Sequence, residues 1–376
     1  MNTINKRTLP NTTHREDKFI FLEEKKLLNL SSNDYLNLGS STELKKEFLN
    51  KIFDNPEAQF SSASSRLLSG NSAPFTRLEK FLAKWYQKDA TLLFNSGYQA
   101  NMGIISALMQ KDAIIFSDKL NHNSILAGIQ HSQAKLCRYK HLDYNHLEDL
   151  LKKNRQNHKQ ALIVSESIFS MDGDFANIEA LIFLKEKYSC LLMIDEAHAI
   201  GVFGEKAQGL SYLHKNNEQI DIIMASLGKA LGSAGAFCVA NQVVIDTLIN
   251  KAQTFIFSTA ISPIQTMWTE FLLTEKFSYL LSQQKKLSNL ITYCQNLSVP
   301  FSCSFGSHII PLILGETEDC VKMAKYLQAK GFFTLPIRPP TVPQHTARIR
   351  LSLNSNMQHE EITNLFQAIK EYPYAV

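Results

Sequence analysis

The sequence predicts an α/β protein, with a large domain built on a mainly parallel sheet and a smaller α+β domain at the carboxyl end. Four short apolar segments bounded by polar residues have the form of buried strands: "QALIVSES" (160–167), "CLLMIDEAH" (190–198), "DIIMASLG" (221–228) and "AGAFCVAN" (234–241). The segment "NIEALIFLKEKYS" (177–189), between the first two, has apolar residues at helical spacing. Strands that are separated by helices pair in parallel, which gives the α/β prediction.

A second lobe is predicted after a long helical region, "FLLTEKFSYLLSQQKKLSNLITYCQNL" (271–297). Beyond it, "HIIPLILG" (308–315) and "ARIRLSLN" (347–354) have strand character, and the latter alternates inward and outward residues. We therefore expect an N-terminal segment (1–33), a large domain (34–268) and a C-terminal α+β domain (269–376).

Composition excludes several classes of protein. The net charge of the 376 residues is only +4 and no block of basic residues occurs, so neither nucleic acid nor a membrane surface is an expected partner. The six cysteines form no C-x-x-C pair and no zinc spacing, which indicates reduced packing residues and no metal site. The N-terminus is polar and no apolar stretch reaches about 18 residues, so we expect a cytoplasmic protein.

One lysine stands among small and apolar residues in "DIIMASLGKALGSAG" (221–235). Burial disfavours the charged ammonium, and a neutral amine at Lys229 is a nucleophile that can form a Schiff base. Asp195, in "IDEAH" (194–198), precedes Lys229 by 34 residues, about one strand-helix-strand unit, so both can lie at neighbouring strand ends, with His198 close by. A carboxylate that faces a pyridine nitrogen keeps it protonated, which makes pyridoxal 5'-phosphate an electron sink.

Further candidates follow other predicted strands. In "NSGYQAN" (95–101), Ser96 and Gly97 precede a predicted helix, whose backbone amides can bind a phosphate, and Ser226 offers a hydroxyl to the same group. His122, in "SDKLNHNSILAG" (117–128), can stack on an aromatic cofactor and donate a proton. Ser170, in "SESIFSMDGDFANI" (165–178), can hydrogen-bond a phenolic oxygen. Each pattern alone is also typical of an ordinary cap or turn.

The "IDEAH" stretch also has the form of the acidic box of a nucleotide-driven helicase. That function needs an upstream phosphate loop, G-x-x-x-x-G-K-[ST]. The only Gly-Lys pair, Gly228-Lys229, lies downstream and is followed by Ala230, so the helicase interpretation fails.

Together these motifs resemble the α-oxoamine synthase family, pyridoxal-phosphate enzymes of fold type I, the aspartate-aminotransferase-like fold. The similarity covers nearly the whole chain, in the family's order: "SSNDYLNL", "SRLLSGN", "SGYQANMG", "DKLNHNSI", "ESIFSMDGD", "IDEAHAIGVFG", "SLGKALGSAG", "IFSTAISP" and "IRPPTVP". The resemblance implies a homodimer with active sites at the subunit interface.

The resemblance also implies roles for individual residues. It makes Lys229 the Schiff-base lysine and catalytic base, Asp195 the partner of the pyridine nitrogen, and His122 the ring-stacking histidine. Cofactor contacts are implied for Gly97, Tyr98, Ser170, His198 and Ser226. Arg350 matches the arginine that pairs with the amino acid's carboxylate. Other substrate-side matches are Asn33, Ser65, Arg338, Thr341 and Arg7, or in place of Arg7 its neighbour Lys6.

Within the family, "IRPPTVPQHTARIRLSL" (337–353) is most similar to the branch that condenses L-alanine with a pimeloyl thioester, carried by CoA or an acyl-carrier protein. Ser65 stands where glycine-using relatives tend to carry threonine, and a smaller residue leaves room for alanine's methyl group, worth about 1–3 kcal/mol. The family's G-S-G-G-S-R reads "SSASSR" (61–66) here, which predicts a stiffer loop. The alternatives are a glycine-using sister enzyme and a non-catalytic acyl-carrier-binding protein on the same fold.

Overall fold

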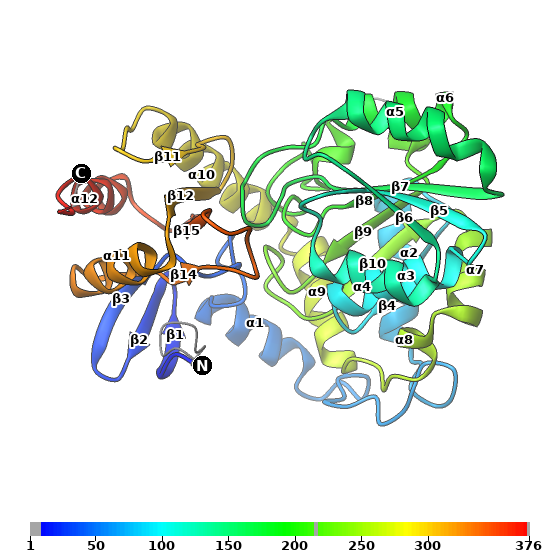
Figure 1. Cartoon of the computed structure of the whole chain (residues 1–376). Coiled ribbons are helices and arrows are strands. Elements are labelled where there is room, and N and C mark those ends of the chain that lie inside the picture. The colour runs from blue at the N-terminus through cyan, green and yellow to red at the C-terminus, as the bar shows by residue number, and fades with distance from the viewer. Residues whose placement is uncertain (1–8, 214–216, 374–376) are drawn as a thin grey trace. The chain divides into compact units, whose positions relative to one another are not determined.

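The computed structural model describes residues 9–213 and 217–373, in two compact units that are treated separately. The large unit comprises Glu43–Phe169 and Phe175–Leu281, and the small unit comprises Met1–Thr42, Ser170–Asp174 and Ser282–Val376. Figure 1 shows the elements of both units, coloured from the N-terminus to the C-terminus. The domain boundaries predicted after residues 33 and 268 stay predictions.

The large unit is built on a seven-stranded sheet in the order β4-β10-β9-β8-β7-β5-β6. Strands β5 to β9 pair in parallel, as predicted, whereas β10 runs antiparallel to both β4 and β9. The strands are β4 (Ala90–Phe94), β5 (Ala113–Asp118), β6 (Lys135–Tyr139), β7 (Gln160–Glu166), β8 (Leu191–Asp195), β9 (Ile222–Ser226) and β10 (Ala236–Ala240).

Helices cover both faces of this sheet. Helices α5 (Tyr144–Asn154) and α6 (Ile178–Lys187) lie on one face, and α3 (Gly97–Leu108), α4 (Asn123–Ser132) and α7 (Gln242–Lys251) lie on the other (Figure 1). The remaining helices are α1 (Thr42–Ile52), α2 (Ala73–Trp85), α8 (Gln253–Ile256), α9 (Pro263–Thr274) and α10 (Phe277–Gln295), the last running on into the small unit. Short 3-10 turns occur at Arg155–Asn157, Leu210–Tyr212 and Asn217–Gln219.

The two covered faces explain why the central strands are continuously apolar. All six residues of β5 and all five residues of β9 are buried. A core cluster fills the space between the sheet and α3, α4 and α7, with Ile104, Ile125, Leu162 and Met193 almost fully buried. Sheets that carry helices on both faces have this pattern, and the fold class predicted from the sequence is confirmed.

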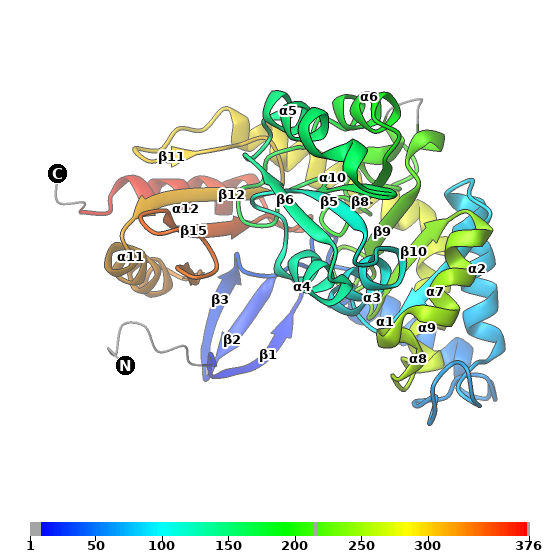
Figure 2. The ribbon, with the colours of Figure 1, turned by 45° about the vertical axis from the view of Figure 1, so that its right-hand side comes forward.

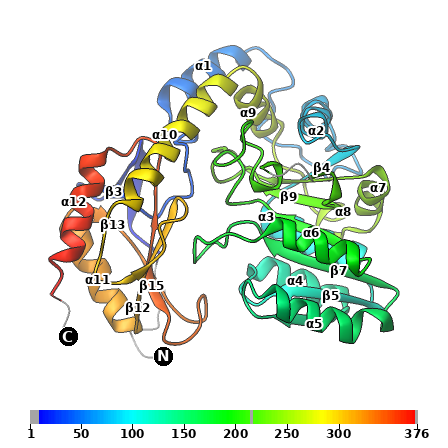
Figure 3. The same cartoon turned by 90° about the horizontal axis from the view of Figure 1, so that it is seen from above.

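The small unit combines two four-stranded sheets with helices. One sheet has the order β1-β2-β3-β13 and the other β11-β12-β15-β14. Figure 2 shows β1, β2 and β3 side by side, and Figure 3 shows α11 against the second sheet. The elements are β1 (Thr12–Glu16), β2 (Phe19–Leu22), β3 (Lys25–Asn29), β11 (Ser302–Cys303), β12 (Ile309–Gly315), α11 (Thr317–Ala329), β13 (Phe332–Phe333), β14 (Pro336–Ile337), β15 (Ala347–Ser352) and α12 (His359–Lys370).

The alternation predicted for residues 347–354 is wrong, because all six residues of β15 are buried. Arg348 and Arg350, which the pattern placed outward, are only 3% and 8% exposed. Arg348 forms an ion pair with Asp172 over 2.5 Å, and the Arg350 guanidinium donates to the Ser170 carbonyl. The segment Ser170–Asp174 therefore covers the polar face of this strand, which turns both arginines into buried residues.

Candidate active site

Seven of the predicted residues in the large unit meet at the carboxyl ends of its central strands. A cavity of about 150 Å³ opens there. This is the edge of an α/β sheet where ligands bind. The lining comprises Gly97, Tyr98, Asn101, His122, Ser124, Glu166, Asp195, Ala197, His198, Met224, Ser226 and Lys229.

Asp195 is the last residue of β8, which fixes its carboxylate at the cavity. Its Oδ1 accepts a hydrogen bond from the Ala197 backbone N–H at 2.9 Å, and its Oδ2 accepts from Asn101 Nδ2 at 2.8 Å. The residue is only 4% exposed. The two fixed donors orient this buried carboxylate, which can still accept from one further partner. A carboxylate held in this way can serve as the counter-charge of a protonated ring nitrogen.

Lys229 follows β9, and its Nζ lies 2.8 Å from His198 Nε2. The loop that carries the lysine turns back tightly into β10, with Gly232 N–H donating to the Lys229 carbonyl at 2.9 Å. Gly235 ends this loop at φ +91°, and a Cβ there would lie 2.8 Å from the Phe94 carbonyl oxygen. Small residues surround Lys229 because the chain reverses direction within a few residues beside β4.

The N-terminus of α3 forms another side of the cavity. Ser96 caps this helix by accepting the Gln99 N–H, and Gly97 and Tyr98 occupy the first turn. A Cβ on Gly97 would come no nearer than 3.9 Å to Ser226, so the approach to these amides is open. Free N–H groups at a helix start and a nearby hydroxyl are suited to a phosphate.

His122 is the N-cap residue of α4 and is exposed at the cavity's mouth. Its Nδ1 lies 2.7 Å from Ser124 Oγ and accepts the Ser124 N–H over 3.2 Å. Partial burial and the Lys229 cation lower the pKa of His122, and the Asp195 carboxylate opposes them. The lowered pKa favours the neutral form of the His122 imidazole.

A second predicted group lies together in the small unit. The Arg350 guanidinium donates to the Ser170 carbonyl, to Asn33 Oδ1 over 3.2 Å, to Ser352 Oγ over 2.7 Å and to Tyr35 Oη over 3.1 Å. Among the residues that the structure describes, no acidic side chain forms an ion pair with Arg350. It is thus a buried cation held only by neutral acceptors.

The other predicted substrate-side residues are described within the unit to which each belongs. Thr341 is exposed in the small unit, where its N–H donates to the Arg338 carbonyl at 3.1 Å. Ser65 lies in the large unit, and its carbonyl accepts from the Gly70 N–H at 3.0 Å. Arg7, with Lys6, lies outside the described residues.

The 61–66 loop takes a conformation in which glycine is favoured at one position. Ala63 has φ +54°, in the left-handed region where a Cβ costs roughly 1–2 kcal/mol. This loop therefore keeps a glycine-like turn although its sequence departs from the family's glycine-rich form.

Five residues that line the cavity were missed by the sequence reasoning: Asn101, Ser124, Glu166, Ala197 and Met224. Asn101 Nδ2 donates both to Asp195 Oδ2 and to Ser124 Oγ, and Asn101 and Ser124 are each 1% exposed. The available signal was spacing, because Asn101 lies four residues after Gly97 on one helix face and Ser124 two residues after His122.

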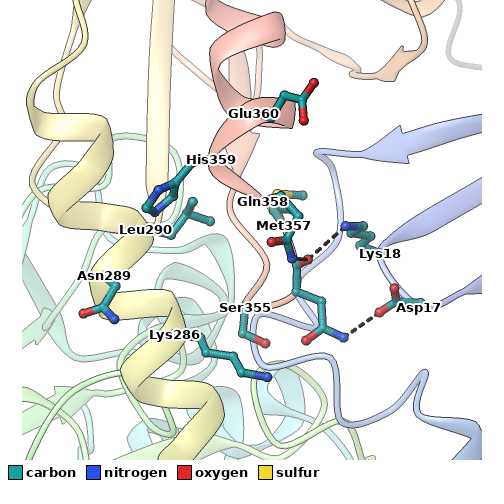
Figure 4. Close-up of a pocket in the computed structure, with 11 residues that line it drawn as sticks. Asp17, Lys18, Lys286, Asn289, Leu290, Ser355, Met357, Gln358, His359 and Glu360 are labelled. Carbon is teal, nitrogen blue, oxygen red and sulfur yellow. Dashed lines mark hydrogen bonds between the residues drawn. The ribbon is translucent and has the colours of Figure 1, made fainter.

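A larger pocket, of about 800 Å³, lies in the small unit (Figure 4). It is lined by Asp17, Lys18, Lys286, Asn289, Leu290, Ser355, Asn356, Met357, Gln358, His359 and Glu360. Asp17 accepts from Asn356 Nδ2, and Lys18 donates to the Asn356 carbonyl and forms an ion pair with Glu361 at 2.9 Å. We assign the chemistry to the smaller cavity, where an amine, two carboxylates and two imidazoles converge.

The smaller cavity fits pyridoxal 5'-phosphate. A cavity of about 150 Å³ holds an aromatic ring the size of benzene. The amine of Lys229 suits the aldehyde, the buried carboxylate of Asp195 suits the ring nitrogen, and the start of α3 suits the phosphate. Fold and site together define a pyridoxal-phosphate-dependent enzyme of fold type I.

Comparison with known proteins gives the family. Residues 25–369 match the family of class I and II aminotransferases. The chain is 41% identical over 375 residues to 8-amino-7-oxononanoate synthase of Haemophilus ducreyi, covering 96% of each protein. It also resembles the crystal structure of 8-amino-7-oxononanoate synthase from Francisella tularensis, with 27% identity, a TM-score of 0.75 and coverage of 92% and 97%.

A serine palmitoyltransferase from S. paucimobilis has the same fold, with a TM-score of 0.87 at 22% identity, covering 95% of this chain and 90% of that one. The chain belongs to the α-oxoamine synthases, within the class I and II aminotransferase family. It is an acyltransferase-type enzyme whose cofactor is pyridoxal 5'-phosphate.

Three structural observations concern membrane segments, metal sites and cysteines, which the composition had raised. In the described ranges, no helix is long and apolar enough to cross a membrane. Over those same ranges, no group of three or more His, Cys, Asp or Glu side chains could hold a metal ion. All six cysteines are free thiols.

Proposed function

We propose that this enzyme condenses L-alanine with a pimeloyl thioester, carried by CoA or an acyl-carrier protein, and releases CO2 and the free thiol. The product is 8-amino-7-oxononanoate, a precursor of biotin. Relatives named 8-amino-7-oxononanoate synthase over nearly the whole chain support this reaction. The observation that carries it is the convergence of Lys229, His198 and Asp195 on one cavity.

Lys229 would hold the cofactor's aldehyde carbon, Asp195 its ring nitrogen, and the first amides of α3 with Ser226 its phosphate. When bound, pyridoxal phosphate supplies an electron sink for the carbanion that forms at the amino acid's Cα. His122 and His198 lie on the same cavity and supply hydrogen-bonding nitrogens to the reacting groups.

Lys229 is the proposed base. Its Nζ takes the Cα proton of alanine once the amine is free, and His198 Nε2, at 2.8 Å, keeps that nitrogen directed into the cavity. His198 and Lys229 each lie three residues after the end of a strand, β8 and β9 respectively, and these two strands pair in parallel.

Arg350 is the proposed partner of alanine's carboxylate. Four neutral acceptors hold its guanidinium, and burial without an anion is costly for a cation. A substrate carboxylate would supply the missing counter-charge through paired N–H donors, and it would fix the orientation of the amino acid.

The reaction balances with these groups and one proton from water. The Cα proton passes to Lys229, Cα then forms a bond to the thioester carbonyl carbon, and the C–S bond breaks to release the thiolate, which takes a proton from solvent. The bond from Cα to the carboxylate then breaks and CO2 leaves. The proton held by Lys229 is finally returned to Cα.

A glycine-using sister enzyme is the alternative, and the residue that bears on it is Ser65. A serine there leaves more room than threonine, which supports alanine as the substrate. Turnover of alanine and glycine, each with pimeloyl-, acetyl- and succinyl-CoA, separates the two. We further propose a cytoplasmic homodimer, because free cysteines are typical of a reducing compartment and the family resemblance implies shared sites.

The test uses Lys229→Ala, with Lys251→Ala on the exposed end of α7 as a matched control. Wild-type enzyme and the control should show the visible absorption of lysine-bound pyridoxal phosphate and form product from alanine and pimeloyl-CoA. Lys229→Ala should lose both signals. A Lys229→Ala variant with unchanged visible absorption and turnover would exclude the assignment.

A further inference from the structure

A chain of hydrogen bonds links Asp195 to His122 through two buried residues. Asn101 Nδ2 donates to Asp195 Oδ2 over 2.8 Å and to Ser124 Oγ over 2.9 Å. Ser124 then contacts His122 Nδ1 through its hydroxyl at 2.7 Å and through its backbone N–H at 3.2 Å. All four residues line the same cavity.

The direction of each hydrogen bond follows from the donors available. A carboxylate only accepts, so the amide of Asn101 must present its NH2 group to Asp195. The same NH2 group occupies a lone pair of the Ser124 hydroxyl, whose single proton is free to point at His122. The Ser124 backbone N–H can only donate.

The backbone N–H of Ser124 donates to Nδ1 of His122, which therefore carries a lone pair and no proton, and the hydroxyl can donate to the same atom. In a neutral imidazole the proton then sits on Nε2. A proton added at Nδ1 would leave the Ser124 backbone N–H without its acceptor and would force the hydroxyl to turn from donor to acceptor.

We propose that Asn101 and Ser124 are positioning residues that hold His122 as a neutral imidazole protonated at Nε2. His122 then acts on a substrate oxygen as a hydrogen-bond donor through Nε2, and not as an imidazolium acid. The role of His122 as a donor to the substrate rests on the proposed function. The proposed tautomer of His122 rests only on its hydrogen bonds.

The titratable groups that line the cavity with His122 come from the neighbouring strands: Glu166 ends β7, Asp195 ends β8, and His198 and Lys229 follow β8 and β9. Asp195 favours the imidazolium and Lys229 disfavours it. The phenol of Tyr98, on α3, meets the imidazole edge to face at 6.5 Å between ring centroids. Because Asp195 and Lys229 act on the pKa of His122 in opposite directions, the hydrogen bonds at Nδ1 determine which ring nitrogen carries the proton.

The experiment measures the ring nitrogens of His122 by NMR in the full chain labelled with 15N-histidine, before and after addition of pyridoxal phosphate. His122→Gln identifies the signal among eleven histidines. Three further variants are compared: Ser124→Ala, Ser124→Thr, which keeps the hydroxyl, and Ser132→Ala. Ser132 is a buried serine at the other end of α4 that bonds the Ile129 carbonyl, so it controls for loss of a buried hydroxyl.

In the wild type we expect the Nε2–H tautomer, with a titration midpoint below that of a free histidine. Ser124→Ala should raise the midpoint by about 0.5–1 pH unit and admit the Nδ1–H tautomer, because one of the two donors at Nδ1 is lost. Ser124→Thr and Ser132→Ala should retain the wild-type midpoint. With alanine and pimeloyl-CoA, kcat/KM of Ser124→Ala should fall about 5- to 30-fold, and Ser124→Thr should restore it.

A wild-type His122 protonated at Nδ1, or a Ser124→Ala midpoint equal to that of Ser132→Ala, would overturn the proposal. The outcomes also separate it from the proposed function. If the tautomer and its shift are as expected and no product forms from alanine, the positioning role stands and the proposed reaction fails. If product forms and the Ser124→Ala midpoint does not move, the positioning role fails.

Discussion

Glu196 lies between Asp195 and Ala197 and is completely buried, and its replacement by glutamine tests how the loop after β8 is held. Its Oε2 accepts from Ser167 Oγ at 2.7 Å and from the Leu210 N–H at 3.1 Å. Its Oε1 accepts from the Ser211 N–H at 2.6 Å and from the Ser211 hydroxyl. Each carboxylate oxygen thus serves one backbone N–H and one hydroxyl.

The size of the destabilisation expected for Glu196→Gln follows from how the four hydrogen bonds are divided between the two carboxylate oxygens. In Glu196→Gln the NH2 group replaces one of the two oxygens, and a serine hydroxyl can rotate to accept from it. A backbone N–H cannot accept a hydrogen bond. Whichever way the amide turns, the backbone N–H of Leu210 or of Ser211 therefore faces the NH2 group instead of an oxygen. A buried donor without an acceptor costs about 1–3 kcal/mol, and loss of the charge-assisted bonds brings the expected destabilisation to roughly 2–4 kcal/mol.

Urea unfolding followed by tryptophan fluorescence measures this loss, because both tryptophans, Trp85 and Trp268, lie in the large unit. With a slope of about 3 kcal/mol per molar urea, the upper end of the usual range, the midpoint should fall by roughly 0.7–1.3 M. Ser167→Ala is the matched control, since it removes a hydroxyl donor and strands no backbone N–H, and it should cost only about 1 kcal/mol. If Glu196→Gln costs no more than Ser167→Ala, the argument from backbone donors is refuted.

Two further predictions use buried charges. Arg66→Ala should cost about 3–5 kcal/mol in the same urea assay, because it strands Glu79, which pairs with both guanidinium NH groups at 2.9 and 3.0 Å and is 15% exposed. Lys159→Ala, from an exposed ion pair, should cost less than about 1 kcal/mol, and equal losses would contradict the role of burial. Arg350→Met should raise the KM for alanine about 10- to 150-fold in steady-state assays and leave that for pimeloyl-CoA nearly unchanged, whereas a common rise in both would count against carboxylate binding.

Residue pattern predicted the parts of the fold that depend on local burial. The four apolar segments became β7, β8, β9 and β10 because strands covered on both faces must be apolar throughout. The antiparallel direction of β10 was not predicted for this strand. It follows from the short loop after Lys229, which returns the chain beside β9 without a crossover helix.

Polar residues were harder to interpret because their environment comes from distant parts of the chain. Arg348 and Arg350 have the spacing of outward residues, and only the segment at 170–174 decides that they are buried. Asn101 shows the same limit. Its importance comes from Ser124 and Asp195, 23 and 94 residues further along the chain, and no pattern within α3 could reveal either.

The charges of the two units also indicate how specificity is divided. In the large unit the cavity's carboxylate, Asp195, is held by neutral donors, and in the small unit the buried guanidinium, Arg350, is held by neutral acceptors. Each charge thus lacks a partner of opposite sign within its own hydrogen-bond set. Such groups are costly in isolation and gain most from a ligand that supplies the counter-charge. A protonated ring nitrogen for Asp195 and an amino acid carboxylate for Arg350 meet that requirement, and each binding event should therefore raise the stability of the unit that supplies the charge.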